Sequence, residues 1–128
     1  MANEISINST IEITNGNFSQ PRTGGAFQSD QAAIGGGGPG VISAVTTSNG
    51  TEVTVTSFVT TPGWCFIKNL DSTNYVTIGC EGTTGVGFLC KLAAGKHVIL
   101  PLNTLTSNKL YVKANASACK VDVQIFES

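Results

Sequence analysis

The chain has 128 residues, the ordinary size of a single domain built around one hydrophobic core. Charged residues make up only 12% of it and the formal net charge is −1, so no strong electrostatic field would attract nucleic acid or an anionic membrane surface. We therefore expect neither as a partner. The first residues lack the basic and apolar segments of a secretory signal, and no stretch approaches the roughly 20 apolar residues of a membrane span. This pattern indicates synthesis in a cytoplasm.

The N-terminal segment alternates isoleucine with polar residues, a period of two that predicts one or two strands, at Ile5, Ile7, Ile11 and Ile13. Residues 15–40 are rich in glycine and proline, and we expect that they neither sustain ladder pairing nor build a core. Residues 1–40 are therefore interpreted as N-terminal strands and a Gly-rich arm. Because an isolated hairpin is marginally stable in water, this segment should pair with its own sandwich or with a neighbouring subunit.

A run of glycines at residues 35–38, followed by Pro39 and Gly40, resembles a phosphate-binding loop only superficially. Such a loop needs Lys-Ser or Lys-Thr and the N-terminus of a helix directly after it, and the sequence predicts neither here. We interpret the run as a flexible linker.

Two runs of mainly β-branched residues, 41–47 and 51–60, flank the turn sequence Ser48-Asn49-Gly50. Asn-Gly favours the positive φ angles of a tight hairpin turn, and it is the strongest local signal in the chain. The sequence therefore predicts that these two runs are strands that pair with each other.

Further strands are expected between successive turn signals, at residues 64–69, 75–80, 86–92, 96–102, 110–112 and 121–125. The last is the clearest, because Val121, Val123 and Ile125 alternate with polar residues. No helical period persists along the chain. Roughly eight short strands predict an all-β fold, an antiparallel jelly-roll-like β-sandwich over residues 41–128, since this closure leaves few exposed edges.

Four cysteines are present, namely Cys65, Cys80, Cys90 and Cys119. Disulfides are rare in a cytoplasm, and no Cys-x-x-Cys pair begins a zinc site. Three of the four, Cys80, Cys90 and Cys119, fall in phase with core-facing neighbours on expected strands. We predict buried free thiols, with a disulfide formed after release from the cell as the alternative that stays open.

No residue pattern predicts catalysis, so we expect no enzyme, no catalytic residue, no cofactor and no metal site. His97 is the only histidine, has no cysteine or acid at ligand spacing, and is not accompanied by a Gly-x-Ser-x-Gly turn. Asp71 and Glu81 lie in separate turns, so they do not form a glycosidase pair. Residues 71–74 contain a single acid, whereas a calcium loop needs several.

Several aromatic residues allow two interpretations, a sugar-binding platform on one sheet or packing in the core. Core packing is favoured for most of them. They are Trp64, Phe66, Tyr75, Phe88, Tyr111 and Phe126.

Residues 63–79 contain a strand that ends in Asn-Leu-Asp and a second that begins with Asn-Tyr-Val and ends in Ile-Gly. A Leu-x-x-Gly turn at 92–95 and a terminal strand at 121–126 follow. Over residues 60–127 this succession resembles small structural proteins of tailed bacteriophages, which include head and tail parts. For the decoration or cement proteins of capsids, the resemblance implies a β-sandwich on the capsid lattice, often trimeric, with N-terminal arms that clamp neighbouring subunits.

The resulting functional prediction is a non-enzymatic virion structural protein of a bacteriophage. It would be made in the host bacterial cytoplasm, decorate the capsid exterior, and stabilise it by bridging subunits of the major capsid protein. A homo-oligomer is expected, with a trimer favoured. Two alternatives stay open: a phage tail, neck or fibre component, and a carbohydrate-binding β-sandwich module that uses exposed aromatic residues.

Overall fold

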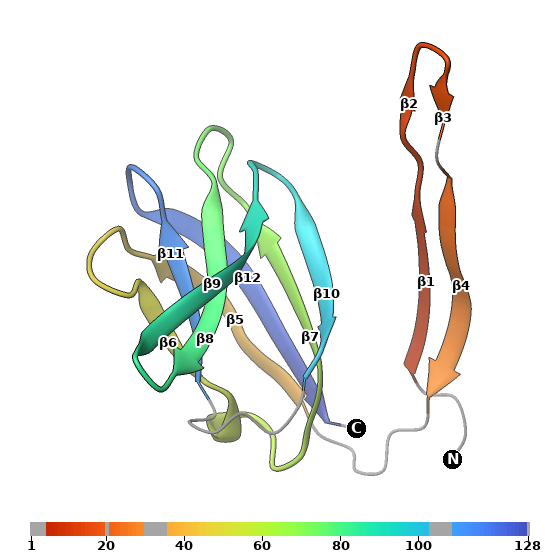
Figure 1. The fold of residues 1–128 in the computed structure, drawn as a ribbon. Helices are drawn as coiled ribbons and strands as arrows, with labels where there is room; N and C mark the ends of the chain where they lie inside the picture. The colour runs from red at the N-terminus through yellow and green to blue at the C-terminus, as the bar shows by residue number, and fades with distance from the viewer. Residues whose placement is uncertain (1–4, 20, 30–35, 103–108, 128) are drawn as a thin grey trace. The chain divides into compact units, whose positions relative to one another are not determined.

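A computed structural model describes residues 5–19, 21–29, 36–102 and 109–127 of the chain. These residues form strands and one short 3₁₀ turn, which confirms the expected all-β class. No helix long and apolar enough to cross a membrane occurs in the described part of the chain. Contacts group the chain into two compact units, residues 1–33 and residues 34–127 (Figure 1).

The first unit is a long antiparallel hairpin with two short strands at its tip. Its strands are β1 (Ile5–Ile11), β2 (Thr14–Asn15), β3 (Phe18–Ser19) and β4 (Arg22–Ser29). β1 pairs with β4 from Ile5 opposite Ser29 to Ile11 opposite Arg22, and β2 pairs with β3. The expectation of N-terminal strands is confirmed, but the expectation that residues 15–40 cannot pair is wrong for β4. A hairpin needs only one partner strand, and β1 supplies it.

The second unit holds eight strands and one 3₁₀ turn. They are β5 (Gly36–Ala44), β6 (Thr51–Thr54), η1 (Val55–Ser57), β7 (Pro62–Asn69), β8 (Val76–Gly82), β9 (Gly85–Leu92), β10 (His97–Pro101), β11 (Lys109–Ala114) and β12 (Cys119–Glu127). They form two four-stranded sheets, in the orders β10-β7-β12-β5 and β6-β11-β8-β9, and every neighbouring pair is antiparallel. This is a β-sandwich-like architecture.

The core of this unit lies between the two sheets and contains side chains from both. On β12 the pattern is strict: Val121, Val123 and Ile125 are fully buried and alternate with half-buried or exposed residues. β7 contributes Cys65 and Ile67, and the opposite sheet contributes residues such as Ile78 and Val112. Period-two alternation therefore places one face of each sheet in the core, as the sequence predicts for β12.

The glycine run belongs to β5 from Gly36 onward, which corrects its interpretation as a flexible linker, and its first residue lies outside the described part of the chain. Gly36 lies opposite Phe126 and Gly40 opposite Val123, so the run pairs with β12. A Cβ atom on Gly38 would collide with the ring of Phe58, and Gly40 has a φ of +79°. Glycine is required here because an aromatic ring covers the backbone and the strand is locally irregular.

The Asn-Gly turn forms, but the hairpin predicted around it does not. The N–H of Gly50 donates to the carbonyl oxygen of Thr47 at 2.9 Å, and Gly50 has a φ of +86°. β5 and β6, however, belong to different sheets. The hydroxyl of Thr51 spans the crossing, because it donates to the carbonyl of Ser43 at 2.7 Å and accepts the N–H of Val45 at 3.1 Å. The prediction failed because the two runs bury their apolar sides against each other across the core instead of pairing edge to edge.

A hydrogen-bonded turn joins β7 to β8 around the fully buried side chain of Asn69. Its Nδ2 donates to the carbonyl oxygens of Asn74 at 2.9 Å and Leu92 at 3.2 Å, and its Oδ1 accepts the N–H of Asp71 at 3.0 Å. The Asp71 carboxylate accepts the N–H groups of Thr73 and Asn74, at 2.7 and 2.6 Å. Asn-Leu-Asp therefore closes the turn and satisfies a carbonyl of β9.

β8 and β9 approach closely beside Gly79, where their register shifts and Leu89 is an extra residue on β9. A Cβ atom on Gly79 would collide with the carbonyl oxygen of Gly87, whereas a Cβ atom on Gly87 would meet no atom within 4 Å. Strand pairing therefore requires glycine at position 79 and tolerates a side chain at position 87.

We expect Gly79→Ala to lower the free energy of unfolding by about 1–3 kcal/mol, because the backbone of β9 must shift to admit the methyl group. The matched control is Gly87→Ala, which should change it by less than about 0.5 kcal/mol. Urea denaturation followed by circular dichroism measures both. Equal losses in the two variants would contradict the close approach at Gly79.

Candidate binding surface

The residues considered for catalysis or metal binding lie apart. His97 is exposed on β10, where its ring stacks on Phe66 with centroids 5.7 Å apart. Asp71 belongs to the β7–β8 turn, and backbone hydrogen bonds from Asn74 and Thr73 lower the pKa of its carboxyl group. Among the described residues, no group of three or more His, Cys, Asp or Glu side chains is placed to hold a metal ion.

The outer face of the sheet β6-β11-β8-β9 carries paired polar side chains as well as the exposed ring of Phe88. The Nζ of Lys109 and the hydroxyl of Tyr111 donate to Oε2 of Glu52, at 3.1 and 3.2 Å. The hydrogen bond from Lys109 is the main reason that the pKa of the Glu52 carboxyl is lowered. Nearby, the Nζ of Lys91 lies 4.0 Å from the ring centroid of Tyr75. Glu52, Lys109 and Lys91 therefore have partners within the chain.

The outer face of the other sheet, β10-β7-β12-β5, is largely apolar. Side chains there alternate with the buried ones of the core, and exposure is substantial for Val41 at 59%, Ile99 at 42% and Phe126 at 39%. Trp64 and Phe66 are half-buried on the same face. We name these residues the aromatic face: Val41, Trp64, Phe66, Ile99 and Phe126.

The aromatic face is built from cross-strand neighbours, so its side chains form rows across the sheet. Phe126 lies opposite Trp64, and Phe66 lies between Ile99 on one side and Gln124 on the other. An antiparallel sheet with one solvent-exposed side normally alternates apolar residues inward with polar residues outward. The apolar outer side of this sheet departs from that rule, and exposed apolar patches mark interaction sites.

A charged row borders the aromatic face. Lys68 on β7 lies opposite Asp122 on β12, and His97 on β10 lies opposite Lys68. Asp122 accepts a hydrogen bond from the side-chain amide of Gln124 at 3.4 Å. In the described part of the chain, the ion pair within 4.0 Å is Glu52–Lys109 on the other sheet, so Lys68 and Asp122 are not joined to each other.

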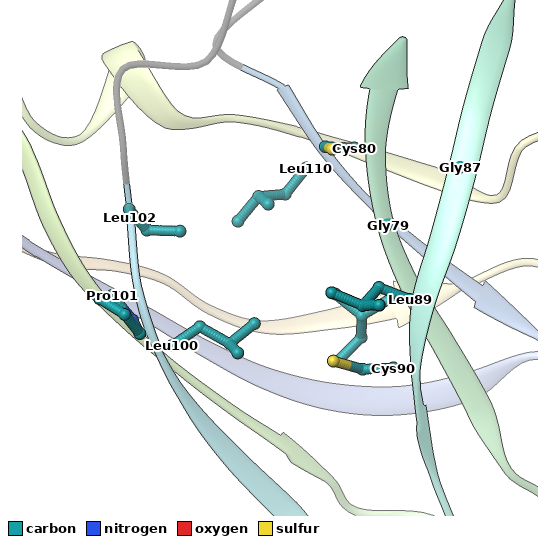
Figure 2. A pocket seen from close by; sticks show the side chains of 10 residues that line it. Gly79, Cys80, Gly87, Leu89, Cys90, Leu100, Pro101, Leu102 and Leu110 are labelled. Atoms are coloured by element: carbon teal, nitrogen blue, oxygen red, sulfur yellow. The ribbon is translucent and has the colours of Figure 1, made fainter.

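A pocket of about 270 Å³ opens between the two sheets at one end of the sandwich. Figure 2 shows the side chains of Leu100, Leu102 and Leu110 directed toward the hollow, across from Leu89 and Cys90. Among the described residues that line it, the titratable side chains are the thiols of Cys80 and Cys90. The pocket therefore has the surface of an apolar binding site and no acid–base pair.

The four thiols differ in their exposure to solvent, so the expectation that all of them are buried is wrong. All four are free, as predicted, and Cys65 and Cys119 are buried, whereas Cys90 is half-buried and Cys80 is exposed. Burial raises the pKa of the Cys65 thiol to about 12. Cys80 has the inward phase that the sequence predicts, but it lines the open pocket instead of the closed core.

The expectation that most of the aromatic residues pack in the core is wrong, because Tyr111 is the one of the six that is buried. Tyr111 is buried, with its hydroxyl bonded to Glu52, whereas Phe88 and Phe126 are exposed on different sheets. The gathering of Trp64, Phe66 and Phe126 on one face depends on β12 pairing with β7, a contact distant in the sequence. The local indication was the spacing of two residues between Trp64 and Phe66, which places both on one face of β7.

Comparison with known proteins gave no relative from which to infer a role. No protein-family model matches the sequence, and no curated protein and no solved structure matches it.

We expect iodoacetamide at pH 8 to modify Cys80 in the folded protein and to leave Cys65 intact until the chain is unfolded. The thiolate is the reactive form, and burial both shields Cys65 and raises its pKa to about 12. Peptide mass spectrometry over a time course measures the two rates. Cys80→Ser is the control that removes the fast site, and rapid labelling of Cys65 in folded protein would contradict its burial.

Proposed function

We propose that this chain is a non-enzymatic virion structural protein that decorates the exterior of a bacteriophage capsid and stabilises it by bridging major capsid protein subunits. The observation that carries the proposal is the presence of two exposed apolar surfaces on one small all-β chain. One is the N-terminal hairpin, on which Ile11, Ile13 and Phe18 are 58%, 48% and 54% exposed. The other is the aromatic face. A protein with two such surfaces is suited to joining neighbours.

The hairpin supports the idea of an arm. A two-stranded sheet is marginally stable alone in water, and its unpaired edges and exposed isoleucines are available to a further strand or an apolar surface. Main-chain pairing with a capsid subunit would add hydrogen bonds without requiring particular side chains. A homo-oligomer, with a trimer favoured, belongs to the same proposal.

The strand order supports the finer, jelly-roll interpretation of the sandwich. From β5 to β12 the strands alternate between the two sheets, except that β8 and β9 are neighbours in one of them, and β12 lies between β5 and β7. Two Greek keys produce such an order in eight-stranded jelly rolls, an architecture used by viral capsid and lectin domains.

A carbohydrate-binding module is the second candidate function, and the aromatic face is the observation that favours it. Aromatic rings on a flat sheet can stack on sugar rings, and Gln124 and Asp122 supply hydrogen-bonding groups beside them. Glycan-array binding that disappears in Phe66→Ala would support this candidate over the virion role.

Quantitative mass spectrometry of purified source particles tests the proposed function. We expect hundreds of copies per particle relative to the major capsid protein, because only the shell repeats a site so often. Three to a few dozen copies would assign the chain to a tail, neck or fibre instead. Absence from the particles would refute the virion role and favour the carbohydrate-binding module.

Deletion of residues 1–33 should leave the sandwich folded and reduce binding to capsids that lack this protein. This boundary keeps β5 intact, since β5 begins at Gly36. Sedimentation of particles with bound protein measures attachment, and circular dichroism measures the fold. Unfolding of the truncated chain would contradict the division into two units, and undiminished attachment would contradict the role of the hairpin as an arm.

A further inference from the structure

We infer that the aromatic face is a contact between two copies of this chain, formed by two β10-β7-β12-β5 sheets that pack face to face about a two-fold axis. This inference goes beyond the proposed function and does not depend on it. It assigns an occupant to the surface from its apolar composition, from its unpaired charges, and from the symmetry of the sheet itself.

The two outer faces of the sandwich differ in how many apolar side chains they expose. The face with the Glu52–Lys109 ion pair exposes the ring of Phe88, whereas the aromatic face gathers five apolar side chains, among them exposed Val41, Ile99 and Phe126. Sheets that pack face to face bury such side chains in a layer about 10 Å thick. An apolar centre with a charged border is also the composition of a protein–protein interface.

The charged residues on this face indicate which partner it binds. Lys68 and Asp122 lie opposite each other on neighbouring strands, but they are not joined in an ion pair between described residues. One copy of the face thus presents Lys68 and Asp122 side by side, with the exposed Lys120 farther along β12 as a second lysine. A surface with this arrangement is electrostatically complementary to itself, which favours a second copy over a partner with charge of a single sign.

The geometry of the sheet allows a two-fold axis to make both contacts at once. β7 and β12 are the two central strands of the sheet. A two-fold axis that lies in the interface, parallel to these strands and above the line between them, places β7 of one copy over β12 of the other. Each cross-strand row then faces the same row of the second copy. Lys68 of one copy then faces Asp122 of the second, and the reverse pair forms as well. The same operation lays Phe66 of each copy over the row that contains Gln124 of the other.

The test measures the mass of the full-length chain in solution by light scattering after gel filtration. We expect wild-type protein to contain an even number of chains, namely two, or six if this two-fold contact joins two of the trimers favoured above. Lys68→Asp and Asp122→Lys, made singly, should each halve that mass and raise the dissociation constant at least about tenfold, because like charges then meet across the interface. The double variant Lys68→Asp/Asp122→Lys should recover the wild-type mass, since the exchange restores both pairs.

Two further variants separate this contact from unrelated effects. Ile99→Lys places a charge in the apolar row beside Phe66 and should also halve the mass, whereas Lys91→Asp on the opposite outer face should not change it. Circular dichroism of every variant verifies that the sandwich is folded.

Three outcomes would overturn the inference: a monomeric wild-type chain at high concentration, an odd-numbered assembly that is unaffected by these variants, and a double variant that stays dissociated. None of them bears on the copy number in particles. Failure of this contact is therefore distinguishable from failure of the proposed function.

Discussion

Exclusion of water from the space between the two sheets is the constraint on which the sandwich depends, and β12 contributes most to it. Val121, Val123 and Ile125 have no exposed surface, and burying each is worth roughly 1.5–3 kcal/mol. Because β12 pairs with β5 on one side and β7 on the other, its register fixes two neighbouring strands. A slip by one residue would turn every one of these side chains to solvent.

Polar groups at the strand ends hold this core closed, and the Asn-Leu-Asp sequence supplies two of them. In the Asn-Leu-Asp turn, Asn69 satisfies carbonyls of two segments from a fully buried position, and Asp71 closes the turn. The Glu127 carboxylate similarly accepts the N–H of Thr60 at 2.6 Å and ties the loop after η1 to the last strand. These residues therefore have structural roles in the turns and loops that they connect.

The two outer faces of the sandwich differ in which of their side chains have partners within the chain. The Glu52–Lys109–Tyr111 group strengthens β6 and β11 by cross-strand contacts at an edge of one sheet. The aromatic face of the other sheet leaves Ile99, Phe126 and the charges of Lys68 and Asp122 available to a partner. Exposed apolar surface is unfavourable in water, and association with a second molecule is the ordinary way to remove it.

The sequence alone determined the all-β class, the positions of most strands, and the inward phase of β12, because each follows from local period-two alternation. It also identified the turn at Asn49-Gly50. Only the tertiary structure decided that the segments around this turn belong to different sheets, that the glycine run pairs with β12 beneath Phe58, and that Cys80 lines an open pocket. The aromatic face belongs to this second group, since it exists only where β7 and β12, more than fifty residues apart, lie side by side. Local sequence fixes which way a side chain points on its own strand, but which strand lies beside it depends on contacts between distant segments.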